Sequence, residues 1–237
     1  MAESIKQSTR IQTSILNGIE KKALVAMASR MPAWVTSDML TWLGFIGAAI
    51  AAVGYALSDY NLAWLWLTYV GIILNWFGDS LDGTLARVRK TQRPVYGFYL
   101  DHNMDGITLS MVCIGVGLSG MLHFAVAMLV LVVYLLLSIY AYIVIDLKGE
   151  HKLTYGKMGP TEFRVIVILI TMVYHFVPAV HNYEKVTTFL GQPVVIGMFD
   201  YFASGVLLIL TVIYFTTLIK DGIAFSKADP LPKRRSE

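Results

Sequence analysis

Six apolar runs of about 20 residues recur along this chain, and they constrain its fold more than any other feature. A helix of about 20 residues crosses the roughly 30 Å of hydrocarbon in a bilayer. Soluble helices rarely stay apolar on all sides for this long, and only 15% of the residues are charged, against roughly 25% in soluble domains. The sequence therefore predicts an all-α integral membrane protein with six transmembrane helices. The runs lie at about 39–57, 62–81, 103–122, 124–146, 163–180 and 198–219.

Basic residues gather in the segments that lie on one side of the membrane if the six helices alternate in direction. Of the 19 Lys and Arg residues, 18 fall at the N-terminus, in 82–100, around 147–162 or at the C-terminus. Only Lys185 belongs to the opposite side. Because Lys and Arg are enriched in cytoplasmic loops, both termini and the 82–100 region are expected in the cytoplasm. The membrane would be a bacterial inner membrane or a eukaryotic endomembrane.

The chain is expected to divide into an arm, a membrane domain and a tail. Residues 1–37 would be a cytoplasmic arm with an amphipathic juxtamembrane helix at about 11–31, which is too polar to span and lies on the membrane surface. Residues 38–225 would form the six-helix membrane domain, and residues 226–237 a basic cytoplasmic tail.

The first membrane helix has a cap candidate and a face of small residues. Ser37 or Asp38 is expected to cap its N-terminus, since short polar side chains accept hydrogen bonds from the first free backbone N–H groups. Small residues on one face allow a neighbouring helix to approach closely. These residues are Gly44, Gly47, Ala48, Ala51 and Ala52.

Four aspartates lie near one end of two neighbouring apolar segments. Asp79 and Asp82 are three residues apart, and Asp101 and Asp105 are four apart, so each pair shares a helix face. The loop between the two helices is short, so both pairs are expected to meet at one level near the cytoplasmic boundary. Clustered carboxylates are costly in a membrane, and divalent cations offset that cost. Mg²⁺ and Mn²⁺ take oxygen ligands, and a two-ion clamp serves phosphoryl chemistry.

Small and basic residues stand at regular steps from the aspartates. Gly83 and Ala86 follow along the same edge of the helix, and Gly97 precedes the second pair by one turn. They leave room for a bulky ligand to approach the backbone. Arg87 adds a positive charge that can balance a bound pyrophosphate. His102 lies inside the motif and is expected to face away from Asp101 and Asp105.

The full pattern reads D-x2-D-G-x2-A-R-x9-G-x3-D-x3-D, and it resembles the signature of the CDP-alcohol phosphotransferase (CDP-alcohol phosphatidyltransferase) family. That family has a six-helix membrane fold with an N-terminal surface helix, so the resemblance extends over most of the chain. All eight fixed positions match. They are Asp79, Asp82, Gly83, Ala86, Arg87, Gly97, Asp101 and Asp105.

The resemblance implies a role for each position. The four aspartates would hold a pair of Mg²⁺ or Mn²⁺ ions that bridge the CDP pyrophosphate, and Asp105 would be the general base on the acceptor hydroxyl, with CMP as the leaving group. Thr41 matches the family's element before the first helix. The implied nucleotide-binding set is Asp79, Asp82, Gly83, Ala86, Arg87, Gly97 and Thr41.

The stretch GKMGPTEFR, residues 156–164, suggests an acceptor site but leaves the substrates open. Its candidate acceptor-binding residues are Lys157, Thr161, Glu162 and Arg164. The basic residues resemble bacterial phosphatidylglycerophosphate and phosphatidylinositol phosphate synthases, which use CDP-diacylglycerol and a phosphorylated alcohol. The GPTE part resembles the choline/ethanolamine branch, which uses a CDP-amino-alcohol and a diradylglycerol. The donor could therefore be CDP-diacylglycerol with a polar alcohol acceptor, or CDP-choline or CDP-ethanolamine with diacylglycerol or ceramide.

Other classes of protein also place acids in membranes. An ion-coupled transporter would spread them through the depth of the bilayer, and an intramembrane aspartyl protease has no use for the glycines and arginine in register. A non-catalytic membrane scaffold would not need four intact aspartates. We expect membrane lipids, a CDP-linked donor and an alcohol or lipid acceptor as partners, a homodimer as the assembly, and no nucleic acid partner.

Overall fold

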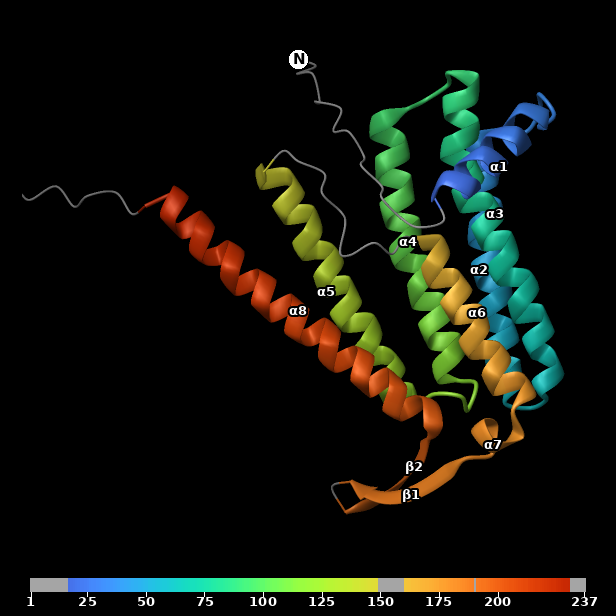
Figure 1. Ribbon diagram of the computed structural model, residues 1–237, viewed down its shortest axis with the longest axis vertical. Coiled ribbons are helices and arrows are strands. Elements are labelled where there is room, and N and C mark those ends of the chain that lie inside the picture. Colours follow the sequence, from blue (N-terminus) through green and yellow to red (C-terminus); the bar gives the residue numbers. More distant parts are fainter. Residues whose placement is uncertain (1–16, 149–159, 190, 231–237) are drawn as a thin grey trace, which may run out of the picture.

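The structure is a computed structural model that describes residues 17–148, 160–189 and 191–230. It is helical apart from one hairpin (Figure 1). The elements are α1 (Asn17–Arg30), α2 (Ser37–Ser58), a 3₁₀ turn (Leu62–Trp64), α3 (Leu65–Arg89), α4 (Pro94–Gly117), α5 (Phe124–Lys148), α6 (Pro160–Phe176), α7 (Pro178–His181), β1 (Glu184–Phe189), β2 (Gln192–Gly197) and α8 (Met198–Ala228).

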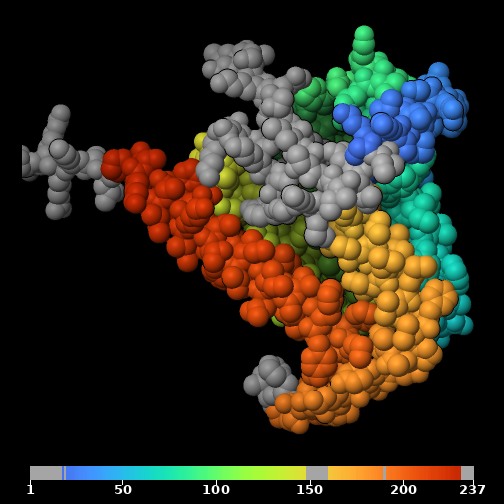
Figure 2. Space-filling view, in the orientation of Figure 1, coloured from blue at the N-terminus to red at the C-terminus, as the bar shows by residue number. Residues whose placement is uncertain are grey.

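Three helices of the described chain are long and apolar enough to cross a membrane. They are α2, α5 over Phe124–Leu147, and α8. These helices indicate an integral membrane protein. The other three predicted crossings correspond to α3, α4 and α6, of which α3 and α4 carry the aspartates and α6 has 17 residues. The prediction of six crossings therefore stays a prediction. Figure 2 shows α8 along the outer flank of the molecule, and exposed apolar side chains such as Leu208, Ile209 and Phe215 suit lipid contact.

The small-residue face of α2 packs against α3 and α4, which confirms its predicted use in close helix packing. A Cβ added at Gly78 of α3 would lie 2.3 Å from the backbone nitrogen of Gly44. A Cβ at Gly115 of α4 would lie 2.4 Å from the carbonyl oxygen of Ala52. Only backbones without side chains between them come this close. Because α2 approaches both helices, it fixes the relative position of α3 and α4.

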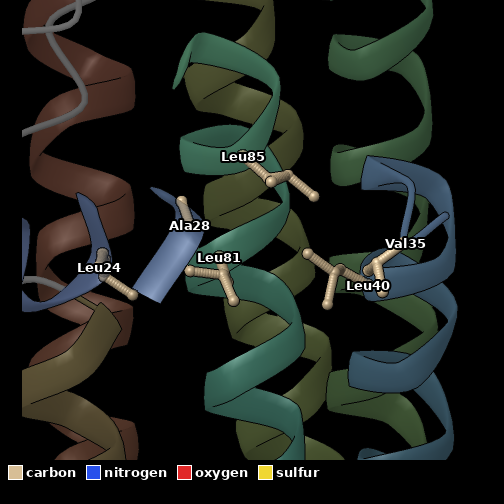
Figure 3. Packing of buried hydrophobic residues seen from close by; sticks show 6 residues of the cluster. All are labelled: Leu24, Ala28, Val35, Leu40, Leu81 and Leu85. Atoms are coloured by element: carbon tan, nitrogen blue, oxygen red, sulfur yellow. The ribbon is translucent and has the colours of Figure 1, made fainter. Parts of the chain in front are cut away.

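Helix α1 packs on the end of α3 that carries the acidic motif. Leu24 and Ala28 of α1 are buried with Leu81 and Leu85 of α3, and Figure 3 shows Val35 and Leu40 on the other side of the same cluster. Residues 11–16 of the predicted amphipathic helix lie outside the described residues. The placement of α1 on a membrane surface stays a prediction.

The linker between α1 and α2 is held by one guanidinium. Arg89, at the end of α3, donates hydrogen bonds to the carbonyl oxygens of Met31 at 3.0 Å and Pro32 at 2.7 Å, and also to that of Val35. A single side chain thus satisfies several backbone acceptors that the linker leaves outside any helix.

The predicted N-cap of the first membrane helix is wrong by one residue. Thr36 is the cap, because its hydroxyl accepts from the backbone N–H of Met39 at 3.2 Å. Ser37 and Asp38 lie in the first helical turn. Ser37 is thereby available to α3, and Asp38 to Arg93.

The segment between the last two predicted crossings, residues 181–197, contains a hairpin. Strands β1 and β2 are antiparallel, with Glu184 opposite Gly197 and Phe189 opposite Gln192. In Figure 1 this hairpin lies at one end of the bundle, while α1 and the turn between α3 and α4 lie at the other. Strand β1, which carries Lys185, and the basic α3–α4 turn therefore lie at opposite ends of the bundle, and the side of the membrane that each end faces stays a prediction.

Candidate functional site

The chain reverses direction between α3 and α4 through a left-handed residue. Lys90 has φ 56° and follows the last turn of α3, and the N–H of Thr91 donates to the carbonyl oxygen of Ala86 at 3.0 Å. Such a six-to-one hydrogen bond satisfies one of the carbonyls that a helix C-terminus leaves free. Pro94 then starts α4 in its first turn. The motif residues before and after the turn are therefore brought to the same end of the bundle.

Three of the four predicted metal-binding aspartates converge. Asp79 of α3 and Asp101 and Asp105 of α4 each offer a carboxylate oxygen, and these oxygens lie within 4.8 Å of one another. Asp79 and Asp101 are half-buried, and Asp105 is exposed. Three carboxylate oxygens at this spacing match the donor set that hard divalent cations prefer. The residues present therefore fit a Mg²⁺ or Mn²⁺ site.

Asp82 is not part of that group of three and is held by the start of α2. The Thr41 hydroxyl lies 2.6 Å from the Asp82 carboxylate, and the backbone N–H of Gly83 donates to the other oxygen. The Ser37 hydroxyl donates to the Asp82 carbonyl oxygen at 2.7 Å. Thr41, predicted to contact the nucleotide, thus contacts a motif aspartate, and the metal-binding role of Asp82 stays a prediction.

An arginine from α6 pairs with one of the three converging aspartates. The Arg164 guanidinium donates to Asp79 at 2.6 Å and to the side-chain oxygen of Asn75 at 3.0 Å. The Asn75 amide in turn donates to the carbonyl oxygen of Gly44 at 3.0 Å, which fixes its orientation. The sequence marked Arg164 as an acceptor-binding candidate but did not predict its contact with Asp79, because the two residues are 85 positions apart.

Glu20 links α1 to the site, and no motif pointed to it. Its carboxylate accepts hydrogen bonds from Thr161 of α6 at 2.6 Å and from Trp76 of α3 at 3.0 Å. Thr161 was predicted to bind the acceptor, and here it anchors the first turn of α6. Glu162 lies half-buried in the same turn, and Lys157 lies outside the described residues.

The predicted nucleotide-binding positions on α3 and α4 have room around them. No described atom lies within 4 Å of a Cβ built at Gly97. A Cβ at Gly83 would meet only the Arg87 guanidinium, at 3.3 Å, and that end of the side chain is flexible. Arg87 is exposed and donates to Thr84 at 2.9 Å, and Ala86 is half-buried beside it. The role of these small residues in nucleotide binding stays a prediction.

His102 does not face fully away from the aspartates, so that expectation is wrong. Its Nδ1 lies 3.8 Å from the Asp101 carboxylate and 2.9 Å from the Phe98 carbonyl oxygen. The imidazole packs between the rings of Phe98, at 4.0 Å, and Tyr142 of α5, at 4.9 Å. Its four-residue spacing from Phe98 on one helix was the signal that could have revealed this packing.

The rim of the site carries an exposed ion pair. Arg93 donates to Asp38 at 2.6 Å and lies over the Tyr96 ring at 4.0 Å from its centroid. The hydrogen bond that Arg93 donates to the Asp38 carboxylate raises the pKa of Arg93 above its ordinary value. Neither side chain contacts the three converging aspartates in any described interaction.

The apolar helices indicate an integral membrane protein, and three of its carboxylates lie close enough together that they could hold a metal ion. Residues 34–218 match the family model described as CDP-alcohol phosphatidyltransferase, so the chain belongs to that family, a class of transferases for substituted phosphate groups. A curated relative is the phosphatidylinositol phosphate synthase of Cutibacterium acnes, 36% identical over 86 residues. That match covers 36% of this chain and 39% of the relative, so the chain spans about two fifths of the relative's length.

Proposed function

We propose that this chain is a membrane enzyme of phospholipid synthesis that moves a phospho-alcohol from a CDP-linked donor to an acceptor hydroxyl and releases CMP. The observation that carries the proposal is the convergence of Asp79, Asp101 and Asp105 from two helices within a family match over 34–218. That match also supports residues 38–225 as the catalytic domain.

Asp79, Asp101 and Asp105 would hold the metal, with Asp82 completing the set for a pair of Mg²⁺ or Mn²⁺ ions. Bound there, the ions would offset the charge of the CDP pyrophosphate and of the phosphoryl group in transfer. Gly83, with Ala86 beside it, and Gly97 leave the backbone accessible to the nucleotide, as the resemblance implies.

Asp105 is the proposed general base, and its exposure supports this role. It is the exposed member of the three aspartates, so an acceptor hydroxyl can reach it while Asp79 and Asp101 remain half-buried. Asp105 takes the proton from the acceptor hydroxyl, whose oxygen forms the new bond to the phosphorus that bears the alcohol. The bond from that phosphorus to the pyrophosphate bridging oxygen breaks, and CMP leaves with it.

We propose CDP-diacylglycerol as the donor and a phosphorylated polar alcohol as the acceptor. The name of the relative from Cutibacterium acnes supports this arrangement. Arg164 supports it as well, because a guanidinium in the site suits an anionic group. The GPTE stretch favours the reverse arrangement, with CDP-choline or CDP-ethanolamine as the donor, and this is the second candidate.

We also propose six crossings, made by α2, α3, α4, α5, α6 and α8, with both termini and the site on the cytoplasmic side. The basic residues at the α3–α4 end of the bundle support that orientation. The amphipathic α1 would then lie on the cytoplasmic membrane surface. A homodimer stays a prediction.

The test is CMP release by purified protein with Mg²⁺ or Mn²⁺. CDP-diacylglycerol would be tested with inositol, inositol phosphate and glycerol phosphate, and CDP-choline or CDP-ethanolamine with diacylglycerol or ceramide. We expect CMP only with CDP-diacylglycerol and a phosphorylated alcohol. Asp105→Asn should abolish turnover and leave some metal-dependent CDP binding, because the other aspartates still hold metal. The control Asp229→Asn, at the exposed end of α8, should keep both.

Turnover by Asp105→Asn would reject the base assignment. CMP only from a CDP-amino-alcohol would reverse the roles of donor and acceptor. Absence of any metal-dependent CDP binding would reject the transferase and return the scaffold and transporter alternatives.

A further inference from the structure

Arg164 places a cation directly on the carboxylate group that is proposed to bind metal. Its Nη2 lies 2.6 Å from Asp79 Oδ2. The Arg164 side chain is 17% exposed and that of Asp79 is 28% exposed, so solvent screens this pair less than a surface pair. A unit charge this close to a shielded carboxylate changes the affinity of that carboxylate for any other cation.

The guanidinium is held by two side chains, Asp79 and Asn75. Asn75 accepts from Nε at 3.0 Å, and its own amide is fixed by Gly44 of α2. The first turn of α6 is anchored by the hydrogen bond from Thr161 to Glu20. The remaining nitrogen, Nη1, is buried and has no hydrogen-bond partner among the described residues. The arginine is thus oriented toward Asp79, and its buried Nη1 is a donor without a hydrogen-bond partner among the described residues.

Arg164 and a divalent ion would bind the same carboxylate. Asp79, Asp101 and Asp105 bring three carboxylates together, and Arg164 contacts one of them. A divalent ion can be shared by all three, because their oxygens lie within 4.8 Å of one another. The divalent ion and the Arg164 guanidinium repel each other, and both would bind the Asp79 carboxylate.

We propose that Arg164 is a counter-cation of Asp79 and that a divalent ion, on binding the three aspartates, displaces it from Asp79. This inference rests on the proposed function, because it takes the three aspartates as metal ligands. Displacement makes the guanidinium available, with Nη1, to a phosphate group of the substrate. Metal and anionic substrate therefore bind in that order, since without the ion Arg164 is already neutralised by Asp79.

The first experiment is a Mn²⁺ titration of the purified full-length protein, in which electron paramagnetic resonance measures the free ion. Arg164→Gln should bind Mn²⁺ about tenfold more tightly than the unmodified chain, because a neighbouring arginine typically lowers a carboxylate's affinity for a proton by a factor of ten or more. Arg93→Gln is the matched control. It removes the same charge from the rim, where Arg93 pairs with Asp38, and should change the affinity less than about twofold.

The second experiment separates displacement from a merely structural role. Thermal unfolding is followed for both proteins with and without saturating Mn²⁺. If the ion displaces Arg164, the substitution lowers the unfolding temperature only without Mn²⁺, so the added ion stabilises the variant more than the parent. A structural role would lower the unfolding temperature equally in both conditions. Should Arg164→Gln fail to fold, Arg164→Lys should still bind Mn²⁺ more tightly than the unmodified chain does. A lysine ammonium lacks the planar guanidinium that donates to Asn75 and Asp79 at the same time.

The outcomes are distinguishable. Equal or weaker Mn²⁺ binding by both Arg164 variants, with clear binding by the unmodified chain, would overturn this inference and leave the proposed function standing. No Mn²⁺ binding by the unmodified chain would overturn both.

Discussion

Gly78→Ala is the sharpest test of the packing that positions Asp79. A Cβ at position 78 would lie 2.3 Å from the nitrogen and 2.7 Å from the Cα of Gly44, and 2.4 Å from the carbonyl oxygen of Leu40. All three are backbone atoms of α2, so no side chain can rotate away. Real Cβ atoms stay at least 3.0 Å from such neighbours. Helix α3 must therefore move away from α2 by about 0.7 Å.

The cost of that movement can be estimated. A gap of 0.5–1 Å forfeits about a quarter to a half of the dispersion energy across an interface, and an added methyl in a packed core typically costs about 1–3 kcal/mol. Because the α2–α3 contact is backbone against backbone along much of both helices, we expect about 3 kcal/mol of destabilisation, the upper end of that range.

The assay is denaturant unfolding in detergent, followed by helical circular dichroism, with Gly205→Ala as the control. Gly205 lies within α8, and no described atom is within 4 Å of its Cβ position. The same substitution there should stabilise the protein by about 0.5–1 kcal/mol, the usual gain of alanine over glycine in a helix. Equal effects of the two substitutions would refute the account of the α2–α3 interface.

Three further predictions concern single contacts. Lys90→Gly should raise the free energy of unfolding by about 1 kcal/mol, because Lys90 has φ 56° and glycine adopts that backbone without strain. Thermal unfolding measures the change, and a loss of stability would contradict the left-handed cap at the end of α3. Thr41→Val should weaken CDP binding severalfold, because Asp82, which is proposed to complete the metal-binding set, loses a hydroxyl at 2.6 Å. Calorimetry in saturating Mn²⁺ measures CDP binding, and unchanged binding would remove Thr41 from the site. Arg89→Ala should lower the free energy of unfolding by about 2–4 kcal/mol and speed proteolysis in the α1–α2 linker, because several linker carbonyls lose their hydrogen-bond donor. A stable, protease-resistant variant would contradict the role of Arg89 in holding the linker.

Much of the helical layout could be predicted because its signals are local. The apolar runs anticipated α2, α3, α4, α5, α6 and α8, and the small residues Gly44 and Gly47 anticipated the close α2–α3 contact. The N-cap was missed by one position because Thr36, Ser37 and Asp38 are all good caps and only the backbone selects among them.

The hairpin was missed for a different reason. Its β-branched residues, such as Val186 and Thr187 on β1 and Val194 and Val195 on β2, favour strands, and Gly191 with φ 81° suits the turn between them. The 17 residues between the last two apolar runs, 181–197, were nonetheless not recognised as containing strands. The turn residue and the β-branched runs on either side of it were the signal that could have found the hairpin.

Sequence spacing by itself determined that acids would gather at the end of two adjacent helices, since helix periodicity and the length of the connecting turn are properties of a short stretch of chain. The membrane class followed from apolar length in the same way. Only the tertiary structure decided which carboxylates meet. Thr41 of α2 contacts Asp82, and Arg164 of α6 contacts Asp79. Glu20 of α1 accepts a hydrogen bond from Thr161 of α6. These contacts join positions 41 to 141 residues apart, and their geometry depends on how whole helices dock, which no local pattern encodes.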